Sequence, residues 1–215
     1  MTAHHHHHPH PRQPDLEDQP YDHHQLMAEA VGELLIEKGV FTAEDLRRTL
    51  EAIDARSPAD GARLVARAWR DPAYRARVLA DVNAAAAELG IDAGAIPIKA
   101  LENTPSLHNL VVCTLCSCYP WPVLGLPPVW YKSPPYRSRA VADPRGVLAE
   151  FGTELPDDVE IRVWDSTSEV RFLVLPERPA GTDGLSEEEL AQLVSRNAMI
   201  GVERVKAPGE GAPAR

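Results

Sequence analysis

The sequence predicts an α+β fold, in which an N-terminal helical part is followed by a small layered α/β part that binds a metal. Three observations lead to this prediction. Residues 26–90 carry helical periodicity and capping signals, whereas residues 91–203 carry short apolar runs separated by prolines and turn residues. The third observation is that all the cysteines lie together, between Cys113 and Cys118.

Residues 1–25 precede the first periodic segment and are expected to form a disordered arm. They contain an unbroken histidine run, His4 to His8, several prolines and the pair His23 and His24. The simplest interpretation is a purification tag or a native low-complexity arm. An alternative is an arm that holds divalent cobalt or nickel, although a flexible run gives imidazole ligands no fixed geometry.

Residues 26–90 are expected to form four helices with short connections, since apolar side chains recur there every three to four residues. The signals that open or close them are, in chain order, Gly39 as a stop, Thr42 as an N-cap, Ser57-Pro58 as an opening and Asp71-Pro72 as an opening. The second helix is expected to run through Ile53 and the third to about Trp69. The fourth is expected to carry Tyr74, Val78, Leu79 and Val82 on one face.

Residues 91–203 are expected to be the α+β metal-binding part. Apolar or alternating runs predict four strands, at 96–101, 110–113, 159–165 and 170–175. The turn residues between the last two make an antiparallel hairpin the expected pairing. Prolines from Pro120 to Pro135 forbid a long helix and favour a rigid, irregular loop.

The C-terminal end of the chain carries one more capping signal. Ser186 and Glu189 match a capping box and predict a last helix over about 187–195. Residues 204–215 are expected to form a disordered tail.

Length, composition and charge exclude several classes of function. The 215 residues are 44% hydrophobic, which is enough for one sizeable core. The net charge of −10 argues against a nucleic-acid surface, because phosphate binding needs clustered Lys and Arg. No run approaches the roughly 20 apolar residues that span a bilayer, and no signal peptide is recognised. We therefore expect a cytoplasmic protein that binds neither nucleic acid nor membrane.

The cysteine cluster Cys113-Thr114-Leu115-Cys116-Ser117-Cys118 is a poor disulfide framework, because its cysteine count is odd and its thiols crowd one segment. Structural zinc and iron–sulfur sites usually take four ligands, and the nearest histidine is His108. A redox CxxC pair would leave Cys118 unexplained. From these residues alone, a zinc site and an unusual transition-metal site both stay open.

The tripeptide Cys116-Ser117-Cys118 can also chelate through its backbone. The nitrogens of Ser117 and Cys118, with the sulfurs of Cys116 and Cys118, close small chelate rings around one ion in a plane. Cys113 then reaches an axial position and leaves the opposite one open for water or substrate. Deprotonated amides need a strongly Lewis-acidic ion, which favours a trivalent metal and electron-rich, easily oxidised sulfurs.

The segment Val111 to Pro128 reads VVCTLCSCYPWPVLGLPP and continues through Trp130-Tyr131-Lys132-Ser133-Pro134. This segment resembles the metal loop of nitrile hydratase α subunits. The flanking segments that share the resemblance are Gly61 to Pro72, Glu102 to Pro105, Arg171 to Pro176 and Arg178 to Thr182. The resemblance covers about residues 26–203 and implies the fold of that family.

The resemblance implies a metal centre and the partners that complete it. The ligands would be the sulfurs of Cys113, Cys116 and Cys118 and the backbone nitrogens of Ser117 and Cys118. Cys116 would be a sulfinic acid and Cys118 a sulfenic acid. Arginines of a separate β subunit, in an αβ or α2β2 assembly, would hold their oxygens, and an activator or chaperone would insert the metal. In the family, threonine at the position of Thr114 accompanies cobalt and serine accompanies iron, so one cobalt(III) ion per subunit is implied rather than iron(III).

The resemblance also implies the reaction, which is the hydration of small nitriles to amides. The implied catalytic residues are Cys118, whose sulfenate is a nucleophile or base, together with Cys116 and Ser117. Trp121 would line the substrate pocket, with core packing as the alternative. The other residues noted are Trp130 and Tyr131, for packing or subunit contact, and Arg137, Arg139 and Arg171, for carboxylates, the partner subunit or solvent.

Two rival functions stay open for the same loop. The γ subunit of thiocyanate hydrolase shares the CTLCSC core, but we expect a basic or otherwise altered residue there at the position of Trp121. A non-catalytic metal-binding or metal-delivery protein would instead hold labile divalent metal and produce no amide.

Overall fold

The computed structural model describes residues 22–116 and 118–209. Contacts within the chain divide it into two units, Met1–Leu50 and Glu51–Arg215, and each is described by itself. Among the described residues, no helix is long and apolar enough to cross a membrane. The predicted division into arm, helical part, α+β part and tail stays a prediction. Residues 1–21 of the arm and 210–215 of the tail lie outside the described residues.

The first unit contains helix α1 (His23–Glu37) and the start of α2 (Ala43–Asp54). α1 begins three residues earlier than expected, because the Asp22 carboxylate accepts the backbone N–H of Gln25 and the Gln25 side chain accepts that of Asp22. The predicted N-cap of α2 is confirmed, since the Thr42 hydroxyl accepts the N–H of Asp45 at 3.1 Å. α1 has no buried residue, and Leu26, Met27, Val31 and Leu34 are among its exposed apolar side chains.

The second unit opens with helices α3 (Pro58–Arg70), α4 (Pro72–Ala80) and α5 (Val82–Glu88). The openings at Ser57-Pro58 and Asp71-Pro72 are confirmed, each with proline in the first turn. The expected fourth helix is shorter than predicted, because the Asp81 carboxylate accepts the N–H of Ala84 and starts a new helix. Of the residues expected on one face of that helix, Tyr74, Val78 and Val82 are buried, whereas Leu79 is 38% exposed.

Four strands form two parallel pairs. β1 (Ile98–Glu102) pairs with β4 (Arg171–Leu175), and β2 (Leu107–Val112) pairs with β3 (Glu160–Asp165). The predicted antiparallel hairpin between 159–165 and 170–175 is therefore wrong. Alternating polarity identified both segments as strands, but this period does not specify the partner of a strand. Each strand instead extends beside an apolar strand from earlier in the chain.

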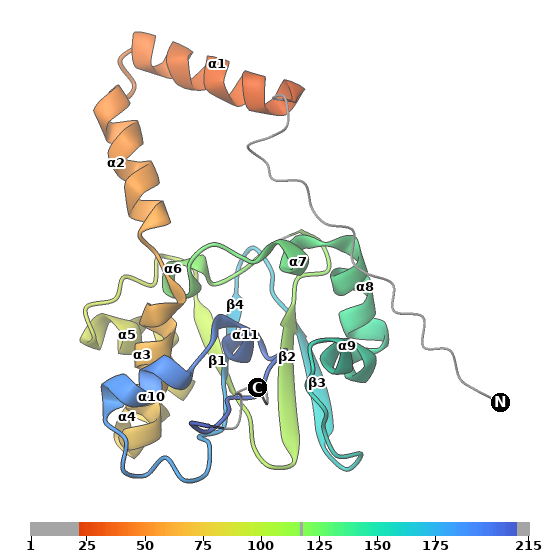
Figure 1. The fold of residues 1–215 in the computed structure, drawn as a ribbon. Helices are drawn as coiled ribbons and strands as arrows, with labels where there is room; N and C mark the ends of the chain where they lie inside the picture. Colours follow the sequence, from red (N-terminus) through yellow and green to blue (C-terminus); the bar gives the residue numbers. More distant parts are fainter. Residues whose placement is uncertain (1–21, 117, 210–215) are drawn as a thin grey trace, which may run out of the picture. The chain divides into compact units, whose positions relative to one another are not determined.

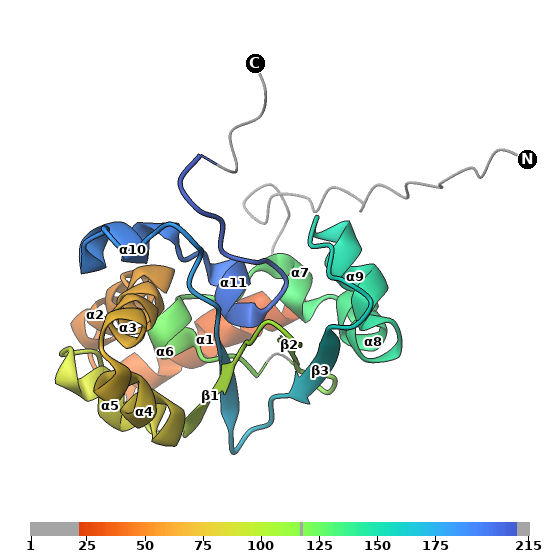
Figure 2. The ribbon, with the colours of Figure 1, turned by 90° about the horizontal axis from the view of Figure 1, so that it is seen from below.

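Helices cover the strands on two sides (Figures 1 and 2). α3, α4, α5 and α10 (Glu187–Leu193) lie on one side, and α8 (Pro134–Ala142) and α9 (Pro144–Glu150) lie on the other. The fully buried side chains between these layers include Leu64, Val65, Tyr74, Leu110, Leu124, Leu148, Leu173 and Leu175. This layering confirms the predicted α+β fold.

The proline-rich segment after the cysteines is more regular than expected. It contains α6 (Trp121–Leu124), α7 (Val129–Lys132), α8 and α9, so the expectation of an irregular loop is corrected. The absence of a long helix in this described segment is confirmed, since the longest of the four has nine residues. Proline in the first turn of α6, α8 and α9 starts these helices, because proline tolerates that position and no interior one.

The C-terminal part of the described chain forms two short helices. α10 begins with the predicted capping box at Ser186 and Glu189, but it ends at Leu193 rather than near 195. A separate helix, α11 (Arg196–Ile200), was not predicted and begins after Ser195, whose hydroxyl accepts the N–H of Ala198.

A buried polar network ties β2 to the end of α11. His108 Nε2 donates to the carbonyl of Gly201 at 2.7 Å, and His108 Nδ1 lies 3.3 Å from the amide nitrogen of Asn103. The Asn103 side chain also accepts the backbone N–H of Asn109 at 2.8 Å. Burial lowers the pKa of His108, the nearby Arg204 lowers it further, and the bond to Gly201 opposes both. The folded protein therefore holds His108 neutral.

We expect His108 to make the folded state less stable in mild acid. Because its pKa is lower in the folded state than the ordinary value of 6.5, the unfolded chain binds the proton more readily. Stability from this residue is present above pH 6.5 and is lost as the pH falls through the folded-state pKa. The slope from one such group cannot exceed about 1.4 kcal/mol per pH unit. Urea unfolding at pH 7.5 and 5.5 measures the effect.

A matched pair of variants assigns that pH effect. His108→Gln should be less stable at both pH values but should lose part of the pH dependence. His23→Gln, which changes a solvent-exposed histidine in α1, should keep the wild-type dependence. Equal pH dependence in wild type and His108→Gln would contradict the assignment.

Candidate metal centre

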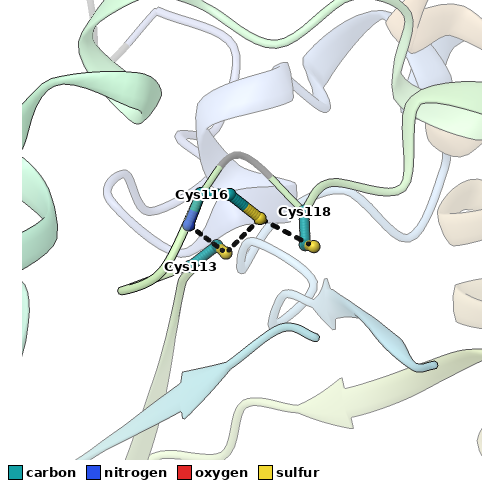
Figure 3. A group of neighbouring side chains, drawn as sticks. All are labelled: Cys113, Cys116 and Cys118. Atoms are coloured by element: carbon teal, nitrogen blue, oxygen red, sulfur yellow. Dashed lines mark hydrogen bonds between the residues drawn. The ribbon is translucent and has the colours of Figure 1, made fainter. Parts of the chain in front are cut away.

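The three cysteines lie on the loop that leaves the carboxyl end of β2. Cys113 directly follows this strand and is 1% exposed, within the hydrophobic core. Cys116 is exposed and Cys118 is half-buried. Figure 3 shows their side chains turned toward one another. The loop thus carries its thiols from the core to the surface over six positions.

The sulfur atoms are close enough to share one ion. Sγ of Cys116 lies 3.6 Å from Sγ of Cys113 and 3.3 Å from Sγ of Cys118, and all three lie within 4.8 Å of one another. A disulfide has its sulfurs about 2.05 Å apart, so these are thiols. Two sulfurs each about 2.3 Å from one ion lie about 3.3 Å apart when at right angles. The donor set therefore fits a thiolate-bound metal.

The surroundings of Cys118 disfavour its free thiolate. Burial raises the pKa of Cys118 to about 12, and the neighbouring thiols of Cys116 and Cys113 act in the same direction, whereas the Arg171 guanidinium lowers it. Thiolate is the metal-binding form, so a cation must displace these protons. A strongly Lewis-acidic ion suits such a site better than a weak one.

A fourth His, Cys, Asp or Glu side chain placed to bind the same ion is absent among the described residues. The three cysteines are the only described group of three or more His, Cys, Asp or Glu side chains placed to share an ion. His108 is engaged with Gly201 and Asn103 inside the core. A four-ligand zinc site through His108 therefore does not fit. Ser117, predicted as a ligand and a catalytic residue, lies outside the described residues.

Thr114 is held through all of its polar groups. Its backbone N–H and its hydroxyl donate to the Asp165 carboxylate at 2.9 and 2.5 Å. Its carbonyl accepts from Arg137 Nη2 at 2.8 Å, and this nitrogen also donates to the carbonyl of Leu115 at 3.0 Å. The residue predicted to influence metal type is thus a structural anchor of the loop.

Tyr131 holds the other end of the loop. Its side chain is 0% exposed, and its hydroxyl donates to the carbonyl of Cys118 at 2.9 Å. Its ring packs against Tyr119, Trp130 and Tyr136, with centroids 5.1 to 6.1 Å apart. Of the two expected roles for Tyr131, packing is therefore the one observed in this chain.

Trp121 lies at the start of α6 and is 39% exposed, so the core-packing alternative is wrong for it. The Arg56 guanidinium carbon lies 5.8 Å from the centre of its ring. A separate shallow hollow of about 410 Å³ lies beside the loop and is lined by Thr114, Pro134, Arg137, Ser138 and Val141. Apolar surface near the cysteines is thus open to solvent in this chain.

The three predicted arginines have three different surroundings. Arg139 pairs with the Glu150 carboxylate at 2.6 Å, and pairing with a carboxylate was one of its expected roles. Arg137 instead donates to loop carbonyls. Nη1 of Arg171 is buried without a hydrogen-bond partner among the described residues. Sequence reasoning missed Asp165 and the contacts of Arg137 and Tyr131 because these residues lie 13 to 51 positions from the loop groups that they bind.

Comparison with known protein families gives a match over most of the chain. The family model described as nitrile hydratase, alpha chain, matches residues 22–203. The chain is 54% identical over 194 residues to the α subunit of the high-molecular-weight cobalt-containing nitrile hydratase of Rhodococcus rhodochrous, covering 88% of this chain and 95% of the relative. It is 55% identical to the cobalt-containing α subunit of Pseudonocardia thermophila, covering 83% and 89%.

Related enzymes with a different substrate or metal are also similar. The γ subunit of thiocyanate hydrolase from Thiobacillus thioparus is 45% identical, covering 86% of this chain and 81% of the relative. A solved structure of a thiocyanate hydrolase variant superposes with a TM-score of 0.82 at 43% identity, covering 91% and 97%. A structure of the Fe-type nitrile hydratase of Comamonas testosteroni Ni1 gives 0.80 at 40% identity, covering 91% and 97%.

Proposed function

Because this chain belongs to the nitrile hydratase α-chain family, we propose that it is the metal-bearing subunit of an enzyme that hydrates nitriles to amides. The observation that carries the proposal is the gathering of three cysteine sulfurs within 4.8 Å on one loop. The reaction adds one water across the R–C≡N bond and gives R–CONH2, with no other product.

The proposed ion is one cobalt(III), held by the sulfurs of Cys113, Cys116 and Cys118 and the backbone nitrogens of Ser117 and Cys118. When bound, it supplies the Lewis acidity that activates nitrile or water. Cobalt rather than iron is supported by the cobalt-containing relatives and by Thr114. The crowded thiols and the unfavourable ionisation of Cys118 support a strongly acidic ion of this kind.

The chain's own residues would bind and activate the substrates. We propose that a peroxide oxidises Cys116 to a sulfinic acid and Cys118 to a sulfenic acid, with one water released for each oxygen added. The Cys118 oxygen would then attack the nitrile carbon or take a proton from water, with Ser117 hydrogen-bonded nearby. Trp121 would contact the apolar chain of the nitrile, since its indole is partly exposed close to the loop in sequence.

A second subunit is proposed to complete the site. Leu115 in the loop is 84% exposed, and Val129 and Val141 in the helices that follow are 55% and 54% exposed. Such apolar exposure is typical of a surface that a partner covers. We propose a β subunit in an αβ or α2β2 assembly, and an activator protein that inserts cobalt. Clustered thiols suit the reducing cytoplasm, where we place the enzyme.

Thiocyanate hydrolysis is the second candidate, because the γ subunit of that enzyme is 45% identical. A thiocyanate ion is charged, so its site gains from a basic side chain. Trp121 offers an apolar face instead, and this favours a neutral nitrile.

One experiment separates the candidate functions. The chain is co-expressed with a nitrile hydratase β subunit in cobalt medium, and the purified complex is assayed with acrylonitrile and with thiocyanate. We expect acrylamide to form. Thiocyanate should be consumed at least about 100-fold more slowly, because a site suited to a neutral nitrile discriminates against a charged ion. Preferred thiocyanate turnover would establish the second candidate, and no turnover of either would contradict enzyme function.

Thr114→Ser tests the choice of metal. Serine keeps both groups that donate to Asp165 and loses one methyl, which is worth about 0.8 kcal/mol when buried. If the methyl favours cobalt, the cobalt-to-iron ratio in protein from medium with equal amounts of both should fall roughly fourfold. Thr153→Ser, the same change at a buried threonine bonded to the carbonyl of Val202, is the control. An unchanged ratio would show that the methyl does not select the metal.

A further inference from the structure

We propose that Arg137 and Tyr131 are positioning residues that hold the metal loop in the shape that receives the ion. The inference rests on the proposed function of that loop, and it assigns to α7 and α8 the role of holding the metal site. The two residues donate hydrogen bonds to backbone carbonyls at the two ends of the loop. None of these observed contacts is to a sulfur.

Arg137 grips the first half of the loop. Its Nη2 donates to the carbonyls of Thr114 and Leu115 at 2.8 and 3.0 Å, and its Nε lies 3.3 Å from the carbonyl of Thr114. No carboxylate of a described residue lies within ion-pair distance of this guanidinium. Two successive carbonyls can face one planar guanidinium only when the backbone turns, so this contact specifies the local conformation.

Tyr131 grips the second half. The hydroxyl that donates to the carbonyl of Cys118 belongs to a fully buried ring packed among other aromatic side chains. The third cysteine is thus fixed through its own backbone.

Tyr131 and Arg137 lie in the consecutive helices α7 and α8. Ser133 lies between Tyr131 and Arg137, ends α7 and caps α8, since its hydroxyl accepts the N–H of Tyr136 at 3.3 Å. Pro134 fixes the backbone at the first position of α8. On the strand side, Asp165 holds the N–H and hydroxyl of Thr114. The first end of the loop is therefore held between β3 and α8, and the backbone of Cys118 at its other end is held by α7.

Holding the loop should slow the loss of metal, because a partner that orients a ligand typically contributes 10- to 100-fold to affinity. The test uses the cobalt-loaded αβ complex with Arg137→Ala, Arg137→Lys and Tyr131→Phe. The controls are Arg139→Ala, an arginine of the same helix that pairs with Glu150, and Tyr74→Phe, a buried tyrosine that donates to the carbonyl of Ala85 at 2.8 Å.

Two measurements on these complexes distinguish positioning from general stability. We expect Arg137→Ala and Tyr131→Phe to release cobalt to a chelator at least about tenfold faster than wild type and to shift the sulfur-to-cobalt absorption band. Arg137→Lys should fall between, since lysine keeps the charge but not the fork. The controls should keep the wild-type rate and band, even where their thermal midpoints fall. Rates and bands in the test variants equal to those of the controls would overturn the proposal.

A readout without cobalt keeps the inference separate from the proposed function. Hydrogen exchange of the metal-free complex reports the amides of Thr114 and Cys116, which donate to Asp165 and to Sγ of Cys113. In Arg137→Ala and Tyr131→Phe these amides should exchange at least about tenfold faster than in the controls, since a released loop opens more often. Unchanged exchange overturns the positioning role. If the wild-type complex retains no cobalt while the two variants still exchange these amides faster than the controls, only the proposed function is contradicted.

Discussion

Cys113→Ala is expected to remove chelator-resistant cobalt from the complex and to lower amide formation more than about 100-fold. Loss of a residue that only hydrogen-bonds to a metal ligand already lowers metal affinity or activity by up to about 100-fold, so loss of a ligand should cost more. Cys113 is the buried end of the sulfur cluster and joins it directly to β2. The lost thiol leaves a small cavity that costs about 1 kcal/mol. The helices should therefore persist, as judged by circular dichroism.

Val112→Ala is the matched control for that cavity. Val112 is the last residue of β2, is 0% exposed and carries no ligand atom of the proposed site in its side chain. This variant should lose more stability than Cys113→Ala and yet retain cobalt. If Cys113→Ala retained chelator-resistant cobalt, its sulfur would not be a ligand. If it lost its helical signal, the loop would be more central to folding than its position indicates.

Gly201→Ala is expected to cause the largest loss of stability, about 3 kcal/mol or more. Gly201 has φ +93°, and an added Cβ would lie 2.0 Å from the carbonyl oxygen of Asn109 in β2. That oxygen belongs to the backbone and cannot move without shifting the strand. The carbonyl of Gly201 also accepts the bond from His108. Urea unfolding monitored by circular dichroism gives the free energy.

Gly152→Ala separates the two causes of that loss. Gly152 has a similar φ of +76°, but nothing lies within 4 Å of an added Cβ. Its variant should therefore show only the backbone strain, about 1 to 2 kcal/mol. Equal losses at the two glycines would contradict the close packing of α11 against β2.

Local signals in the sequence predicted the starts of helices well. Thr42, Ser57, Asp71 and Ser186 each accept a hydrogen bond from an N–H two or three residues later. Such a bond lies within one turn, so the residues that specify it are adjacent in the sequence. Asp81 belongs to the same class and was missed because the apolar pattern continued across it.

Strand partners depend on residues that are far apart. The pairing of Ile98 with Arg171 joins positions separated by most of the α+β half, and no local pattern encodes it. The turn between β3 and β4 made a hairpin the simplest prediction. The buried edges of β1 and β2 offer each strand a parallel partner, and burial of apolar side chains decided the pairing.

The candidate site divides in the same way. The cysteine spacing was visible because Cys113, Cys116 and Cys118 lie within one short segment. The groups that hold the loop come from β3, α7 and α8. Asp165, for example, lies 51 positions from Thr114. A carboxylate or guanidinium at such a distance is indistinguishable in the sequence from one on a solvated surface.

The cobalt content of the purified αβ complex after exhaustive chelator treatment tests the central claim most directly. The treatment matters because His4 to His8 can bind labile divalent cobalt or nickel, which a chelator removes. The account predicts about one retained cobalt per α chain in wild type, as a closed set of thiolate and amide ligands requires, and none in Cys113→Ala. Retained zinc, or no metal that resists the chelator, would contradict it.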